Sequence, residues 1–237
     1  MVALNSPLPA DEPARPARSD GQLARERLLG EALRLFSEQG FARTSTRAIA
    51  QAAGANISAI SYYFGDKQGL YRCAFLEPMS SSNVQEQIDG WNDPGLSLEQ
   101  ALHRFYSGML APLEQSESMR HCMRLHMREM LDPTGLWQHE IEHSLRPIYH
   151  ALWGLVCRHL GLAQHDEGIQ RLVLAMCGMP IHLMATPDMV QIISPALQQG
   201  PSPVGRAVAH LVRYALALIH DEARQRGLPS PVSGVDP

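Results

Sequence analysis

The sequence predicts an all-α protein with a short N-terminal group of helices and a longer helical C-terminal part. Apolar residues recur at helical spacing through most of the 237 residues, and no long stretch alternates between apolar and polar side chains. Gly and Pro residues separate these stretches. An apolar share of 45% is enough to bury a core in one large domain or two small ones.

The two ends are predicted to be flexible tails. Residues 1–19 and 227–237 are rich in Pro and contain no periodic apolar face. The first helix is expected at about 22–39, because Leu29, Ala32, Leu33 and Phe36 share one face and Gly40 can end the helix in a left-handed conformation.

A group of short helices follows. One is predicted over 46–53 and the next over 57–64, joined by the three-residue turn Gly54–Asn56, in which Asn56 can accept a backbone N–H. Another helix begins at about Asp66. Two short helices joined by such a turn form a helix-turn-helix, whose second helix enters the major groove of DNA.

Longer helices are predicted in the C-terminal part. The expected ranges are 97–115, 118–131, 137–160, 166–185 and 203–226, after a loose or partly helical connector over 80–94. Pro112, Pro147 and Pro180 lie inside three of these ranges, so a kink or a restart is expected at each.

Charge and cysteine content narrow the function classes. The net charge of −4 gives the whole molecule no strong attraction to nucleic acid, yet residues 41–75 contain four basic side chains (Arg43, Arg47, Lys67, Arg72) and one acid (Asp66), a net of +3. The four cysteines are far apart, which favours reduced thiols in a cytosol. No 18-residue uncharged apolar stretch is present, so a soluble, cytoplasmic protein without membrane contact is expected.

The outward face of the second short helix suits DNA. Ser58, Ser61 and Tyr62 point away from the inward residues Ile60 and Phe64, with Tyr63 beside them. Small or hydroxyl side chains let a helix lie close to base edges and reach phosphates. The alternative is that Tyr62 and Tyr63 pack half-buried on the three-helix core. Lys67 is the only lysine, and a solvated helix start is its alternative role.

The segment FARTSTRAIAQAAGANISAISYYFGDKQGLYRCAF (41–75) resembles the DNA-binding domain of the TetR family of bacterial transcriptional regulators. The resemblance implies that double-stranded DNA is a partner. It assigns phosphate contacts to Thr46 and Lys67. It assigns recognition-helix contacts to Ile57, Ser58, Ser61, Tyr62 and Tyr63. Arg47 of the basic patch is added to the predicted DNA-binding residues. Ile57 and Ser61 depart from the family pattern, and Ile57 either faces a thymine methyl group or folds back onto the core.

The segment 128–161 resembles the helical C-terminal domain of the cefoperazone/chloramphenicol-sensitivity regulators. Between the tails predicted at 1–19 and 227–237, the two resemblances imply a helix-turn-helix domain at 20–76 and an effector-binding and dimerisation domain at 79–226. The expected function is a ligand-responsive transcriptional regulator, a repressor that a small apolar effector releases from a palindromic operator. No enzyme activity and no cofactor are expected.

Apolar and aromatic residues of three successive C-terminal helices are predicted to line the effector pocket, with a fully packed core as the alternative. The predicted set is Phe105, Tyr106, Met109, Met123, His126, Met127, Trp137, Tyr149 and Trp153.

Apolar stripes on the last two long helices favour a homodimer through a four-helix bundle, as the family resemblance implies. The stripes comprise Ile169, Leu172, Val173 and Met176 on one helix, and Val204, Ala207, Val208, Leu211, Tyr214, Ala215 and Leu218 on the last. The alternative is that they belong to the core of a monomer.

Two further patterns contain possible metal ligands, and a solvated helix face is the alternative for the first of them. His139-Glu140-Ile141-Glu142-His143 matches the zinc metalloprotease motif H-E-x-x-H, which makes a metal-dependent hydrolase the alternative function. The segment 119–131 concentrates Met, His and Cys residues that could sense a thiophilic metal, line a pocket or form core.

Overall fold

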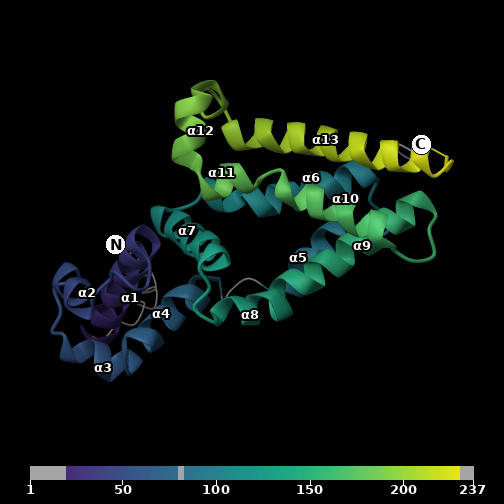
Figure 1. Ribbon diagram of the computed structural model, residues 1–237. Coiled ribbons are helices and arrows are strands. Elements are labelled where there is room, and N and C mark those ends of the chain that lie inside the picture. The colour runs from purple at the N-terminus through teal and green to yellow at the C-terminus, as the bar shows by residue number, and fades with distance from the viewer. Residues whose placement is uncertain (1–19, 80–82, 230–237) are drawn as a thin grey trace, which may run out of the picture.

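The computed structural model describes residues 20–79 and 83–229, and all regular elements in these ranges are helical (Figure 1). Residues 1–19 and 230–237 of the predicted tails lie outside the described residues. The predicted all-α fold class is therefore confirmed.

Four helices gather at the N-terminal end of the molecule (Figure 1). They are α1 (Asp20–Gln39), α2 (Thr46–Ala52), α3 (Ser58–Phe64) and α4 (Lys67–Leu76), and the 3-10 turn η1 (Glu77–Met79) follows. Their apolar faces meet in one core that includes Leu28, Phe36, Ile49, Ile60 and Phe75. Gly40 ends α1 with φ +81°, as its position predicted.

The C-terminal part contains the remaining helices. In chain order they are α5 (Val84–Trp91), α6 (Leu98–Leu110), the 3-10 turn η2 (Ala111–Leu113), α7 (Glu117–Leu131), α8 (Leu136–Glu140), the π-helix η3 (Ile141–Leu145), α9 (Arg146–Leu160), α10 (Glu167–Gly178), α11 (Ile181–Ala185), α12 (Pro187–Ile193), the 3-10 turn η4 (Pro195–Leu197) and α13 (Pro203–Gln225). Figure 1 shows α7 between the N-terminal helices and the long helices, with α13 running along the far side.

The three internal prolines act as expected. Pro112 lies in η2, Pro147 lies in the first turn of α9, directly after the π-helix, and Pro180 separates α10 from α11. The expected helix 166–185 is therefore two helices, and the expected helix 137–160 is interrupted by a π turn. α12 was not predicted, because its seven residues are too few to show a clear periodicity.

Most of the stripe assigned to a dimer interface is instead core of the protomer. Ile169, Val173, Met176 and Ala215 are fully buried, and Leu211 is 6% exposed. These side chains pack with α6 and α9 in a second hydrophobic cluster. Only Tyr214 and Leu218 of the predicted set remain clearly exposed, at 45% and 38%.

Among the described helices, the stretch Glu167–Ala185 is long and apolar enough to cross a membrane by length and composition alone. The structure breaks it at Met179 and Pro180, and it buries Ile169, Val173 and Met176 in the core. An apolar face turned toward the protein interior accounts for its hydropathy.

Candidate nucleic-acid interface and ligand cavity

The turn between α2 and α3 is fixed by local hydrogen bonds. The Ser45 hydroxyl accepts the Ala48 N–H at 3.1 Å and caps α2, while Gly54 adopts φ +59° so that the Ala55 N–H reaches the Ala50 carbonyl at 2.9 Å. The Asn56 carboxamide oxygen accepts the Ser58 N–H at 2.9 Å and the Ser58 hydroxyl at 2.8 Å. The Asn56 side chain therefore accepts a backbone N–H at the start of α3 as predicted, although α3 begins one residue later than expected and Ile57 holds the N-cap position.

The second helix of this motif turns one face into the core and one face outward. Ile60 and Phe64 are buried, whereas Ser58 and Ser61 are exposed and Tyr62 is 82% exposed. Ile57 is 49% exposed, so it does not fold back onto the core. The exposed face of α3 therefore carries two hydroxymethyl groups, one phenol and one aliphatic side chain that a DNA groove could receive.

Tyr63 is the member of the predicted set that the core partly uses. Its side chain is half-buried, its ring lies edge-on to Tyr62 with centroids 4.8 Å apart, and a Cβ added to Gly21 of α1 would lie 3.0 Å from its hydroxyl oxygen. The alternative that it packs on the three-helix core therefore applies to Tyr63, whereas the exposure of Tyr62 leaves its whole ring available.

Lys67 is held at the start of α4. Its Nζ lies 4.3 Å from the centroid of the Phe41 ring, a cation–π contact, and Asp66 caps the helix by accepting the Gly69 N–H at 2.8 Å. A Cβ on Gly69 would lie 2.0 Å from the Phe64 carbonyl oxygen, so only glycine lets α4 pack this closely on the end of α3. Thr46 and Arg47 lie at the start of α2, with Arg47 exposed.

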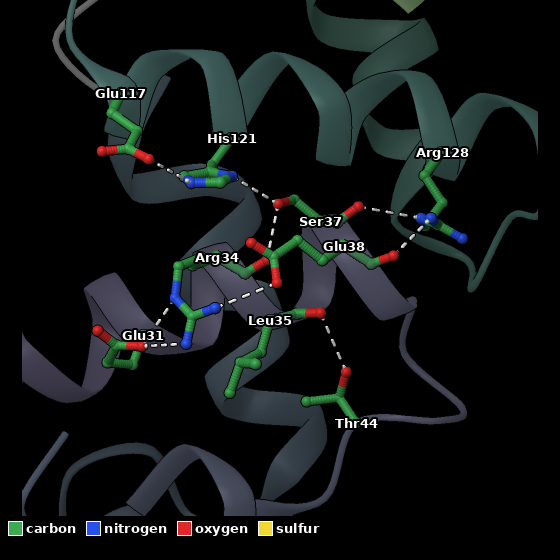
Figure 2. Close-up of polar contacts among 9 residues, drawn as sticks. All are labelled: Glu31, Arg34, Leu35, Ser37, Glu38, Thr44, Glu117, His121 and Arg128. Atoms are coloured by element: carbon green, nitrogen blue, oxygen red, sulfur yellow. Dashed lines mark hydrogen bonds and ion pairs between the residues drawn. The ribbon is translucent and has the colours of Figure 1, made fainter. Parts of the chain in front are cut away.

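Helix α7 joins the C-terminal part to the N-terminal helices (Figure 2). Cys122 and Leu125 are buried in the N-terminal core, and Arg128 donates to the carbonyls of Ser37 and Glu38 at 3.3 and 3.1 Å. His121 Nδ1 lies 2.9 Å from the Ser37 hydroxyl. Because that hydroxyl already donates to the Arg34 carbonyl at 2.7 Å, His121 Nδ1 is the donor of the contact.

A second hydrogen bond between the N-terminal helices and α7 is fully buried. The Tyr71 hydroxyl of α4 donates to Glu129 of α7 at 2.6 Å, and both side chains are almost completely buried. The Thr134 N–H and hydroxyl donate to the same carboxylate at 2.7 and 2.9 Å. Burial and the bond to Glu129 raise the pKa of Tyr71 well above its usual range, so its hydroxyl stays a donor.

A cavity of about 1030 Å³ lies on the other side of α7. Its walls come from the end of α6, η2, α7, α11, α12, η4 and the first half of α13. Apolar residues such as Met123, Met179 and Leu183 share these walls with charged ones such as Arg120 and Arg124. The volume suits a drug-sized molecule.

Comparisons with known proteins agree with this architecture. Residues 98–219, more than half of the chain, match the family described as the C-terminal domain of the HTH-type transcriptional dual regulator CecR, and residues 28–73 match the bacterial regulatory proteins of the tetR family. The chain is 30% identical to the dual regulator CecR of Shigella flexneri over 155 residues, which are 62% of this chain and 69% of the relative.

The chain belongs to the TetR family. It is a DNA-binding transcriptional regulator with a CecR-type C-terminal domain. Another relative, the regulator AcrR of Shigella flexneri, is 41% identical over 73 residues, 31% of this chain and 33% of the relative.

Solved structures show the same fold at lower identity. A TetR-like transcriptional regulator from Rhodococcus sp. RHA1 aligns with a TM-score of 0.56 and 18% identity, over 82% of this chain and 96% of the other. HlyIIR, a hemolysin II transcriptional regulator, aligns with a TM-score of 0.56 and 17% identity, over 82% and 98%.

The TetR-family fold distributes the nine predicted pocket residues over several places. Met123 alone lines the large cavity. Phe105 and Tyr106 are buried in the C-terminal core, where the Tyr106 hydroxyl donates to the Met176 carbonyl at 3.1 Å. Met109 and Met127 pack against that core. The structure therefore does not gather the predicted set around one cavity.

The remaining predicted residues lie in two separate surroundings. The His126 ring stacks on Phe75 with centroids 4.1 Å apart, and Trp137 packs against the N-terminal core. Tyr149 and Trp153 border a smaller pocket beside α10. Most of the cavity residues that the sequence did not indicate come from the segment between α11 and α13, which lies far along the chain and whose approach to α7 has no local signal.

The H-E-x-x-H segment of this regulator crosses from α8 into the π-helix. The rings of His139 and His143 stack with centroids 4.0 Å apart, and His143 Nδ1 bonds the His139 carbonyl at 2.9 Å. In the described residues no three His, Cys, Asp or Glu side chains come together as metal ligands, and this includes Cys122 and His126 of segment 119–131. The family and its relatives are transcriptional regulators, so the hydrolase alternative is not supported.

Proposed function

We propose that this TetR-family regulator is a cytoplasmic homodimeric repressor that binds a pseudo-palindromic operator and is released by a small molecule bound in the large cavity. The observation that carries the proposal is the position of α7. This one helix lines the cavity with His121 and holds α1 through the bond between His121 and Ser37 (Figure 2).

The exposed face of α3 supports recognition of the operator. Ser58, Ser61 and Tyr62 offer hydroxyl groups toward base edges and phosphates, and Ile57 offers a methyl surface toward thymine. Thr46, Arg47 and Lys67 are proposed phosphate ligands on either side, and Tyr63 contributes its exposed edge. Sequence preference then depends on α3, whereas overall affinity depends on the flanking basic groups.

The operator is released if the ligand binds better to a conformation in which the spacing of the two α3 helices of the dimer does not match the two half-sites. A tenfold loss of operator affinity requires about 1.4 kcal/mol of coupling, and operator DNA must weaken ligand binding by the same factor. Rearrangement of α7 can supply this coupling, because α7 contacts the N-terminal helices through both the Ser37–His121 and Tyr71–Glu129 bonds.

A dimer face is available on α10 and α13. Leu174 is 62% exposed, Tyr214 45% and Leu218 38%, although most residues of the two apolar stripes, such as Ile169, Val173 and Ala215, are buried in the protomer. A two-fold dimer would bury these side chains against their own copies.

The test is selection of DNA from a random pool by the full-length protein, followed by fluorescence anisotropy on the selected site. The proposal expects a two-fold-symmetric site, two protomers per site, and affinity that falls steeply with salt because much of the binding is phosphate neutralisation. Equal binding to random DNA, or insensitivity to salt, would refute operator recognition.

A further inference from the structure

The large cavity has an uneven balance of charge. Three arginines, Arg120, Arg124 and Arg206, line it, against two carboxylates, Glu117 and Asp188. The charge of the walls is therefore +1 with the lining histidines neutral, in a chain whose net charge is −4. The cavity walls are therefore slightly basic although the chain as a whole is acidic.

The ion pairs at the cavity do not use all three guanidinium groups. Arg124 Nη2 lies 3.5 Å from Asp188 Oδ2, and Glu117 Oε1 lies 3.8 Å from His121 Nε2. Arg120 donates to the Gln115 carbonyl at 3.1 Å, and Arg206 donates to backbone carbonyls of residues 199 and 201. Within 20–79 and 83–229, neither Arg120 nor Arg206 has a carboxylate partner.

These two guanidinium groups line the cavity from two different helices, α7 and α13. A guanidinium carries five N–H donors, and one or two bonds to backbone carbonyls leave the others free. Acidic groups that present two oxygens side by side, such as carboxylates, match this donor geometry, and a neutral or cationic ligand leaves the arginine charge uncompensated.

The rest of the wall is apolar and adaptable. Met123, Met179 and Met184 contribute flexible thioethers, and Leu183 and Val190 contribute aliphatic surface. Methionine fills irregular gaps and accepts ligands of different shape. The cavity therefore combines an apolar surface with basic groups that lack acidic partners.

We infer that the cavity binds an organic anion with an apolar body, its acidic group on Arg120 and Arg206 and its body against the methionines. This inference rests on the proposed ligand-responsive function and names the chemical class of the ligand. It changes the ligand expected from the sequence, a small apolar molecule, because the arginines of α7 and α13 were not predicted to share a cavity.

The experiment compares octanoate, 1-octanol and octylammonium, which have the same alkyl chain and differ in charge. Isothermal titration calorimetry of the full-length protein at pH 7 is expected to show octanoate binding at least tenfold more tightly than octanol, with octylammonium weakest. Equal or tighter binding of octanol or octylammonium, or no binding of octanoate, would overturn the inference.

Variants test where the anion binds. Arg120→Gln and the double variant Arg120→Gln/Arg206→Gln are expected to weaken octanoate binding by tenfold or more and to leave octanol binding within threefold. Arg104→Gln is the matched control, since Arg104 is exposed, donates to the Gly90 carbonyl at 2.9 Å and does not line the cavity. Because Arg120 is also exposed, its single variant is expected to keep the wild-type melting temperature. An octanoate preference that survives in the double variant would overturn the inference.

Operator affinity measured on the same samples separates this inference from the proposed function. Arginine-dependent octanoate binding that leaves operator affinity unchanged supports the ligand class and contradicts release of DNA through this cavity. Arginine-dependent binding that weakens operator binding supports both.

Discussion

Replacement of Tyr71 by Phe tests the buried link between α4 and α7. The change removes one hydroxyl that donates at 2.6 Å to the Glu129 carboxylate, and keeps the ring that packs edge-on to Phe36 with centroids 4.9 Å apart. The loss is therefore a hydrogen bond to a buried charged group and not a cavity. Such bonds contribute about 1.5–3 kcal/mol.

Thr134 still donates to Glu129 through its N–H and its hydroxyl, so the carboxylate keeps part of its hydrogen bonding. We therefore expect the free energy of unfolding to fall by about 2 kcal/mol, within the range for a charged acceptor. For a chain of this size, a loss of about 2 kcal/mol lowers the melting temperature by roughly 4–8 °C.

The assay is thermal and urea unfolding followed by circular dichroism. Tyr62→Phe is the matched control: it removes the same hydroxyl from a side chain that is 82% exposed, and it is expected to change stability by less than about 0.5 kcal/mol. A double-mutant cycle with Glu129→Gln should show non-additive losses, because the two groups contact each other. If Tyr71→Phe unfolds within about 0.5 kcal/mol of the wild type, the link does not hold α4 and α7 together.

Three further predictions concern DNA, the dimer and pH. Lys67→Ala should weaken binding to all DNA sequences alike and reduce the salt dependence, whereas Ser61→Ala should alter sequence preference. Fluorescence anisotropy on a panel of sites measures both effects. A sequence-selective effect of Lys67→Ala would contradict its phosphate role. Leu218→Arg should yield folded monomers in analytical ultracentrifugation, and a soluble dimer of this variant would place the interface elsewhere. Leu211 is 6% exposed, so Leu211→Arg should instead lower the free energy of unfolding by several kcal/mol. Burial lowers the pKa of His126 below its ordinary value near 6.5. As the pH drops below about 6.5 the unfolded chain binds the proton first, so the stability of the fold should decrease. Urea midpoints across pH should show a smaller decrease for His126→Phe than for the wild type, and parallel pH curves for the two proteins would disprove this contribution.

Local sequence determined the helix-turn-helix. The turn depends on Gly54 and Asn56, whose conformational freedom and side-chain bonding act within a few residues, and the inward positions of Ile60 and Phe64 follow from a 3.6-residue period. Both kinds of signal are contained in a short window of sequence. The exposure of Tyr62 and the identification of the family followed from this segment.

Tertiary structure decided the cavity, the core and the dimer face. An apolar residue on an amphipathic helix satisfies the same pattern whether it faces a core, a ligand or a second copy. The pattern alone therefore predicts a pocket at Phe105 and Tyr106 and an interface at Leu211, whereas the structure buries all three in the core. The contact between Ser37 and His121 joins residues 84 positions apart, and the cavity brings α7 together with α13. No local pattern encodes such distances along the chain, because the packing of all the helices together determines which of their faces meet.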